Sequence, residues 1–110
     1  MSQSHKRTGP LTGVKIVDMS SVVLGPFATL IFGDLGADVI KIEAGQTGKA
    51  GDMMRYAGAS PTGDLGPIFT SLNRNKRSVQ FDAKQADDRA AIIAMLKDAD
   101  VFFHNVRPQS

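Results

Sequence analysis

Hydrophobic and polar positions alternate in short runs along this chain, and stretches with helical spacing separate those runs. Four runs predict strands: residues 14–19 (VKIVDM), 38–43 (DVIKIE), 77–82 (RSVQFD) and 100–105 (DVFFHN). Each is short and rich in β-branched or aromatic residues, as strands are. Helical segments between them give the order β-α-β-α-β-α-β. Because crossovers between parallel strands are right-handed, this order predicts an α/β, Rossmann-like, mostly parallel sheet with flanking helices.

The first helix is expected to begin near Pro26, a residue that suits the first turn of a helix. Gly36 is placed to end this helix in a left-handed conformation. Helical spacing predicts that one apolar face of this helix contains Phe27, Leu30, Ile31 and Leu35.

Two further helices are expected, and the first is a short one over residues 67–72. Asp82 is expected to cap the second, with Gln85 three residues later as in a capping box. The narrow apolar stripe of that helix is expected to consist of Ala86, Ala90, Ile93 and Leu96.

Glycine is concentrated in one segment, residues 44–66. Six of the chain's 11 glycines fall there, together with Pro61. A compact domain rarely holds so long a loop without secondary structure. Such loops are usually functional, or they are ordered by a group that the sequence does not contain.

Composition indicates one folded domain with a modest core. The chain has 110 residues, of which 42% are hydrophobic and 22% charged. We expect a flexible tail at residues 1–9 and an α/β domain over residues 10–110. The absence of cysteine excludes disulfides, cysteine-bound metals and a thiol nucleophile, and the two histidines lack metal-ligand spacing.

Charge and hydropathy also limit the classes of binding partner and the cellular compartment that we expect. The net charge is only +2, which does not indicate nucleic acid. No apolar run reaches membrane-spanning length, and the polar start lacks the apolar core of a secretory signal. We expect a cytoplasmic protein with no metal and with neither nucleic acid nor membrane as a partner.

Four segments follow the carboxyl ends of the predicted strands, where parallel sheets bind their ligands. Lys84 suits a phosphate, and a surface lysine is the alternative. Asn105 offers both donors and acceptors, and a turn residue is the alternative. Arg107 could hold an anion through two hydrogen bonds. The four segments are residues 20–25, the residues from Ala44 onward, residues 82–84 and residues 105–107.

The first of these segments does not indicate a dinucleotide site, because SSVVLGPFATL lacks the Gly-x-Gly-x-x-Gly pattern. Glu43 ends the second strand, where a dinucleotide fold keeps its ribose-binding carboxylate. A surface carboxylate near Lys41 is the alternative. The sequence contains no carboxylate pair, Ser-His-Asp set or metal cluster. The residues alone therefore indicate part of a nucleotide-type binding fold without a visible catalytic group.

Motifs from residue 10 to residue 108 resemble, in order, the N-terminal part of the class III CoA-transferases. That family includes formyl-CoA transferase, carnitine CoA-transferase and α-methylacyl-CoA racemase. The first stretch, PLTGVKIVDMSSVVLGPFATLIFGDLGADVIKIE, resembles the family's opening strand, Gly-Pro helix start and second strand. The later motifs are GDMMR (51–55), NRNKRS (73–78) and ADVFFHNVRP (99–108).

The resemblance implies a site for coenzyme A. Family members contact CoA from the loop after the first strand, the end of the third strand and the block after the fourth strand. Some relatives place an arginine beside the CoA adenine, at the position of Ala44 in this chain. The corresponding contact residues in this sequence are Val23, Leu24, Phe81, Asp82, Ala83, Lys84, Asn105, Val106 and Arg107.

The resemblance also implies a reaction, acyl-CoA:carboxylate CoA transfer in an interlocked homodimer. An aspartate attacks the donor thioester to form a mixed anhydride, CoA thiolate attacks the anhydride, and the acceptor acid then takes over the CoA. That aspartate lies downstream of the last motif, so we expect an N-terminal fragment that is inactive alone. A racemase, which moves the proton α to the thioester, and a non-catalytic CoA- or nucleotide-binding fragment remain alternatives.

The basic turn NRNKR leaves its own alternatives open. Arg74, Lys76 and Arg77 could attract the phosphates of CoA, or they could pair with carboxylates across the interlocked dimer. An RNA-binding domain would depend on this turn alone and lacks the aromatic residues that stack on bases. An NAD-dependent oxidoreductase lacks the glycine pattern described above.

Overall fold

The computed structural model describes residues 7–45 and 50–108. Its elements alternate in the predicted order, with one additional short 3-10 helix, η1. In chain order they are β1 (Lys15–Met19), α1 (Leu24–Asp34), β2 (Asp38–Ala44), η1 (Met53–Tyr56), α2 (Pro67–Leu72), β3 (Lys76–Phe81), α3 (Ala86–Asp98) and β4 (Val101–His104).

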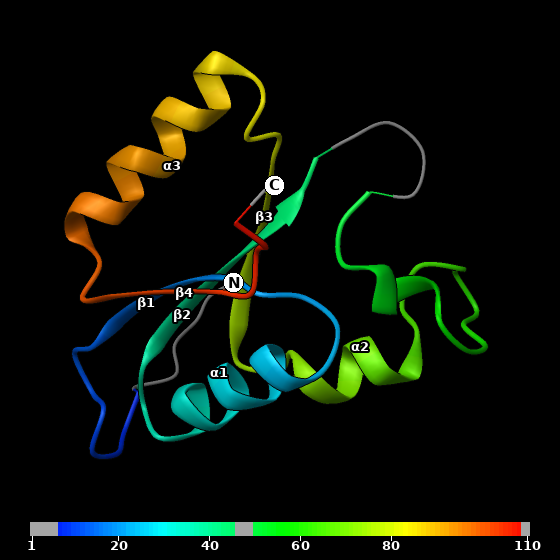
Figure 1. Cartoon of the computed structure of the whole chain (residues 1–110). Helices are drawn as coiled ribbons and strands as arrows, with labels where there is room; N and C mark the ends of the chain where they lie inside the picture. Colours follow the sequence, from blue (N-terminus) through cyan, green and yellow to red (C-terminus); the bar gives the residue numbers. More distant parts are fainter. Residues whose placement is uncertain (1–6, 46–49, 109–110) are drawn as a thin grey trace.

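The four strands form one sheet in the order β3-β2-β1-β4, and each neighbouring pair is parallel. The helices α1 and α2 lie on one face of the sheet and α3 lies on the other (Figure 1). This confirms the predicted fold class. Since all four strands run in one direction, the segments that follow them gather at one edge of the sheet.

The two faces of the sheet differ in chemistry. Val17 and Ile42 pack against Ile92 on the α3 face. On the α1 face, Ile16 and Val39 form an apolar cluster near the amino ends of the strands. Strand side chains alternate between faces, so two residues further along each strand the α1 face receives charged groups. These are Asp18 and Lys41, which are buried.

Those charges explain why the predicted apolar face of α1 is wrong. Phe27, Ile31 and Leu35 are 49%, 42% and 39% exposed, and of the four predicted positions only Leu30 is buried. The buried face consists mainly of small residues, Gly25, Pro26, Thr29 and Gly33, together with Leu30. Small and polar groups suit this contact, because the Thr29 hydroxyl donates to the Asp18 carboxylate over 2.6 Å. The helix ends as predicted, with Gly36 at a φ of +106°.

The predicted cap of α3 is also wrong. The Asp82 carboxylate accepts a hydrogen bond from the Lys84 N–H, and the helix begins only at Ala86, with Gln85 at the N-cap. Asp88, in the first turn, reaches back to accept from the Asp82 N–H over 2.8 Å. The turn at residues 82–85 therefore delays the helix by three residues.

The buried face of α3 also differs from the prediction. Ile92 is buried, while Ile93, which the sequence pattern placed in the stripe, is 50% exposed. Ala86 and Ala90 are exposed as well. Of the predicted stripe, only Leu96 packs against the core. The residues that pack around Val17 and Ile42 from this side are Ile92, Met95, Leu96 and Ala99.

The described part of the glycine-rich segment is folded. η1 begins after Asp52, whose carboxylate accepts from the Met54 N–H over 3.0 Å, and α2 has the predicted bounds. In the segment before β1, Arg7 donates to the Ala37 carbonyl over 2.9 Å. None of the helices in the described ranges has the length and apolar character that a membrane crossing requires.

Candidate functional site

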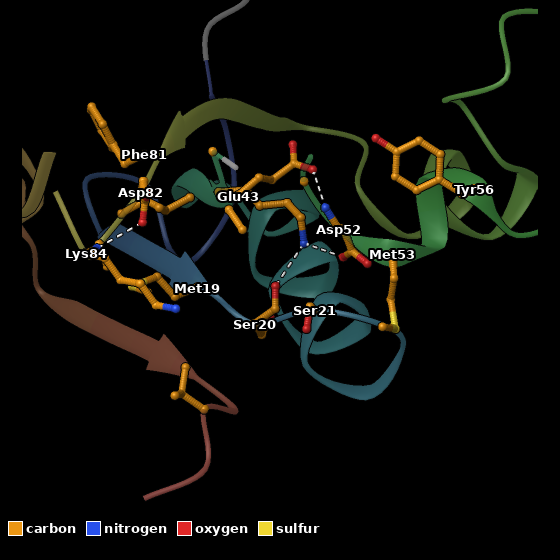
Figure 2. A pocket seen from close by; sticks show the side chains of 17 residues that line it. Met19, Ser20, Ser21, Glu43, Asp52, Met53, Tyr56, Phe81, Asp82 and Lys84 are labelled. Atoms are coloured by element: carbon orange, nitrogen blue, oxygen red, sulfur yellow. Dashed lines mark hydrogen bonds and ion pairs between the residues drawn. The ribbon is translucent and has the colours of Figure 1, made fainter. Parts of the chain in front are cut away.

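A cavity of about 670 Å³ opens at the carboxyl ends of β1, β2 and β3. Its wall also includes parts of the glycine-rich segment and of the chain after β4, at the edge where parallel sheets bind ligands (Figure 2). Pockets for small molecules and cofactors have volumes of roughly 300–1,000 Å³. The cavity is therefore large enough for a substantial part of a nucleotide-like ligand.

The expected contact residues divide into two groups. Those in the wall of the cavity are Phe81, Asp82, Ala83, Lys84 and Val106. The other four, Val23, Leu24, Asn105 and Arg107, are exposed and lie outside the wall. The apolar side chains among these four are strongly exposed: Leu24 is 82% and Val23 is 45% exposed.

The turn between β3 and α3 presents Lys84 to the cavity. The Asp82 carboxylate accepts from the Lys84 N–H over 3.0 Å, and the Arg89 guanidinium donates to the Ala83 carbonyl over 2.9 Å. These bonds hold the backbone while the Lys84 side chain stays exposed at the cavity wall (Figure 2). An ammonium group in this position can hold an anion.

Asn105 ties two loops together across the same edge. Its side-chain amide donates to the Ser21 carbonyl over 2.9 Å and its oxygen accepts from the Ser21 N–H over 3.3 Å. These two bonds connect the end of β4 to the loop after β1. Asn105 is thus more than a simple turn residue, because its side chain supports the loop that carries Val23 and Leu24.

Lys41, Glu43 and Asp52 lie at the floor of the cavity, and Arg55 pairs with Glu43 there without lining the cavity itself. None of the four was assigned to the site from the sequence. The Lys41 ammonium lies 2.9 Å from the Asp52 carboxylate, and both side chains are at most 2% exposed. Arg55 binds the Glu43 carboxylate with two hydrogen bonds of 2.7 Å. A signal was present in the sequence, because Gly-Asp-x-x-Arg brings Asp52 and Arg55 onto one short turn after a strand that ends in Glu43.

Glu43 is bound on all sides by groups of the same chain. It is therefore neither a ribose-binding carboxylate nor a surface carboxylate, the two alternatives that the sequence left open. Its carboxylate is buried and accepts from Arg55, from the Ser78 hydroxyl and from the Asp52 N–H. Burial raises the pKa of Glu43, but these hydrogen bonds outweigh burial and lower the pKa to about 2. The carboxylate is therefore charged and structural, and it is not available to a ribose.

The basic turn before β3 pairs with carboxylates of the same chain. Arg74 lies 2.7 Å from Asp34, and Arg77 lies 2.9 Å from Asp38. Lys76 is buried and approaches Asp18. All three cations therefore have carboxylate partners within the chain, and a role of the turn across a dimer stays a prediction. The turn also lies at the amino end of β3, whereas the cavity lies at the carboxyl end.

The cavity thus offers an exposed cation, an apolar wall and hydrogen-bonding groups, which suit binding of a large anionic ligand. Among residues 7–45 and 50–108, no group of three His, Cys, Asp or Glu side chains is arranged to hold a metal ion. His104 is turned to its own backbone, because its Nδ1 accepts from the Val106 N–H over 3.1 Å.

Comparison with known proteins supplies the family context. An acyl-CoA transferase of Fusarium pseudograminearum (strain CS3096) is 46% identical over 98% of this chain and 25% of its own length. The acetyl-CoA:oxalate CoA-transferase of Acetobacter aceti is 39% identical over 94% of this chain and 25% of its own length. The human succinyl-CoA:glutarate CoA-transferase is 42% identical over 90% of this chain and 22% of its own length.

Solved structures agree with these relatives. The crystal structure of a CAIB/BAIF family protein from Brucella suis superposes with a TM-score of 0.80 and 32% identity, and the match covers 91% of this chain and 26% of that chain. The chain therefore spans about a quarter of the length of the relatives it matches. The model of CoA-transferase family III matches residues 11–110, and the chain belongs to that family.

Proposed function

We propose that this chain forms the CoA-binding part of an acyl-CoA:carboxylate CoA-transferase. The observation that carries the proposal is a cavity at the carboxyl ends of three parallel strands in a chain of CoA-transferase family III. Two relatives are named for acetyl-CoA with oxalate and for succinyl-CoA with glutarate. These names favour transfer of CoA between acids over racemisation, so an acyl-CoA and a carboxylic acid are the proposed substrates.

Nine residues are proposed to contact CoA, and Lys84 is the proposed phosphate ligand among them. An exposed ammonium on a flexible stem at the wall of the cavity matches the charge of a phosphate group. The arginines of the basic turn are not proposed for this role, because they pair with Asp34 and Asp38 at the amino end of β3, away from the cavity. The nine proposed residues are Val23, Leu24, Phe81, Asp82, Ala83, Lys84, Asn105, Val106 and Arg107.

The proposed chemistry is nucleophilic catalysis by a carboxylate. An aspartate attacks the thioester carbonyl, the C–S bond breaks, and CoA leaves as the thiolate while a mixed anhydride forms. The thiolate then attacks the aspartyl carbonyl of the anhydride, which releases the donor acid and leaves an aspartyl-CoA thioester. The acceptor carboxylate attacks this thioester, so that a second anhydride forms and the thiolate leaves again. Attack of the thiolate on the acceptor's carbonyl gives the new acyl-CoA and frees the aspartate. No residue of this chain is assigned to the attack. We also propose that the active species is an interlocked homodimer and that it works in the cytoplasm.

CoA binding is tested by titrating the complete gene product with CoA in a calorimeter. Loss of a charged phosphate contact in Lys84→Ala is expected to raise the Kd about tenfold. Arg77→Ala is the matched control, because it removes the same charge from an exposed ion pair at the other end of β3. Equal Kd values for wild type and Lys84→Ala would remove Lys84 from the site, and absence of any binding would refute the proposal.

Transfer is tested separately by mass spectrometry of the CoA esters. Acetyl-CoA or succinyl-CoA is incubated with the protein and with oxalate or glutarate, and formation of a new CoA thioester supports the transferase. An α-methylacyl-CoA incubated with the protein in deuterated water tests the alternative. Exchange of its hydrogen α to the thioester, without a new thioester, would identify a racemase instead.

A further inference from the structure

We propose that Lys41 and Asp52 form a buried positioning pair that holds the loop after β1 in the conformation required by the site. The inference rests on the proposed function, since the loop carries Val23 and Leu24 of the proposed CoA contacts. Lys41 is contributed by the middle of β2, and Asp52 is contributed by the turn that leads into η1. Both residues lie at the floor of the cavity.

The pair holds the backbone of the loop on both sides of Ser21. The Lys41 ammonium donates to the Ser20 carbonyl over 3.0 Å and to the Asp52 carboxylate over 2.9 Å. Dashed lines in Figure 2 join the labelled Ser20 and Asp52 to this ammonium. The two Asp52 oxygens accept from the Val22 N–H over 3.2 and 3.3 Å. One ion pair thus fixes a carbonyl and an amide only two residues apart.

The loop needs such support because Val22 adopts an unfavourable conformation. Its φ is +76°, in the left-handed region. A β-branched side chain is strained there, and a strained residue persists only where its surroundings hold it. The hydrogen bonds from the Val22 N–H to Asp52 are the contacts that restrain it most directly. Backbone strain of this kind is concentrated at functional sites, and here it precedes Val23 and Leu24.

Asp52 is itself held by several hydrogen bonds, so it can restrain the backbone of the loop. Its own N–H donates to the Glu43 carboxylate over 2.8 Å, and its side chain also accepts from the Met54 N–H. Glu43 is in turn bound by Arg55. The loop after β1 is therefore coupled through Asp52 to β2 and to η1, at the two sides of the cavity floor.

Stability alone does not explain a charged pair in this position. Removing two charges from water costs several kcal/mol per ion, and well-packed apolar residues often serve the fold as well or better. A buried pair that instead makes directed hydrogen bonds to a strained loop has a conformational role. The second buried pair, Lys76 and Asp18, supports the same loop from beneath, because Lys76 donates to the Pro26 carbonyl and Asp18 accepts from the Ser20 N–H.

The test compares three variants of the complete gene product, Lys41→Met/Asp52→Leu, Asp52→Asn and Arg77→Ala. The double variant removes both charges and keeps apolar bulk. Asp52→Asn keeps an acceptor for the Val22 N–H but removes the charge, and it covers the case in which the double variant fails to fold. Arg77→Ala controls for loss of an ion pair far from the loop.

The first readout is hydrogen exchange of the amides of residues 20–25, measured by mass spectrometry without any ligand. We expect exchange to rise at least about tenfold in the double variant and to rise less in Asp52→Asn, while Arg77→Ala matches wild type. Unchanged exchange in both Asp52 variants would overturn the inference. This readout needs no activity, so it decides the inference even if the proposed function fails.

The second readout is the kinetics of CoA transfer. Displacement of a loop by about 1 Å costs roughly 100-fold in rate, so kcat/KM of the double variant is expected to fall by about that factor while its thermal midpoint stays near that of wild type. A lowered midpoint with unchanged kcat/KM would mean that the pair only supports the fold. No transfer by wild type would refute the proposed function but not the role of the pair.

Discussion

The ammonium group of Lys76 lies 3.3 Å from the carboxylate of Asp18, and the two side chains are 1% and 0% exposed. This ion pair joins β3 to β1 across β2, beneath the start of α1. Lys76 also donates to the Asn73 side chain and to the Pro26 carbonyl, so its ammonium group has two hydrogen bonds besides the ion pair. The lysine of the basic turn is therefore part of the core.

Replacing Lys76 by methionine is expected to destabilise the protein, because the Pro26 carbonyl and the Asn73 side chain would lose their buried donor and Asp18 would lose its neighbouring cation. Such losses cost about 3–5 kcal/mol. The measurement is the thermal midpoint of the complete gene product, with Arg77→Ala as the control for an exposed pair worth less than about 1 kcal/mol. Asp18→Asn/Lys76→Met, which removes both charges, should recover only the part of the loss that comes from the Asp18 charge. A normal midpoint for Lys76→Met alone would contradict the assignment.

High pH is expected to stabilise the fold, because it removes the buried charge of Lys76. Burial lowers the pKa of Lys76 to about 8 from an ordinary value of 10.5, the Asp18 charge opposes this decrease, and the Lys41 charge adds to it. Between these two pH values the unfolded chain binds more protons at this site than the folded chain. Stability should therefore rise with pH across that window.

Thermal midpoints measured from pH 7.5 to 10.5 check this expectation, with the same series on Lys76→Met as the reference. The difference between wild type and variant should grow as pH rises. A constant difference would show that Lys76 keeps its ordinary pKa.

Low pH is expected to lower the stability of the fold by protonating Glu43. The carboxyl group has its pKa lowered from 4.5 to about 2, so its contribution to stability is complete above pH 4.5 and is lost as pH falls toward 2. The whole contribution amounts to about 3 kcal/mol, since one pKa unit corresponds to about 1.4 kcal/mol.

Glu43→Gln is the test of this contribution, because glutamine does not titrate. The stability advantage of wild type over Glu43→Gln, measured by urea unfolding, should shrink steadily between pH 4.5 and 2. Parallel pH profiles for the two proteins would exclude a Glu43 carboxylate with a lowered pKa.

Replacing Val22 by glycine is expected to leave a more stable protein than replacing it by alanine, which is the reverse of the usual order. At most loop or strand positions alanine is the more stable of the two, but the φ of +76° favours a residue without a Cβ atom. Val22→Gly should therefore be more stable than Val22→Ala by about 1 kcal/mol. Both variants lose the valine side chain, so the comparison isolates the backbone. Thermal midpoints in the opposite order would show that Val22 is not held in a left-handed conformation.

Local patterns were sufficient for much of the fold. Alternation in VKIVDM and DVIKIE placed β1 and β2, and Pro67 placed the start of α2. The predicted faces of α1 and α3 were wrong for a common reason. Phe27 and Ile93 have the helical spacing of core residues, yet the sheet surface beneath each helix decides which side it covers, and that surface is formed by residues distant in the sequence.

Likewise, the candidate site was predicted only in outline. The carboxyl ends of the strands and Lys84 followed from the topology and from the resemblance. The charged floor did not follow, because Lys41 and Glu43 read as solvent-facing positions in alternating strands. Their burial depends on partners such as Asp52 and Arg55, whose approach requires the fold of the glycine-rich segment.

By itself, the sequence determined the order of elements, the parallel sheet and the edge at which the cavity opens, because these depend on periodicity and turn residues that act locally. The tertiary structure alone decided that Asp18, Lys41, Glu43 and Lys76 are buried and that the basic turn faces away from the cavity. A charge can be buried only where a partner compensates its lost hydration, and those partners lie on other elements.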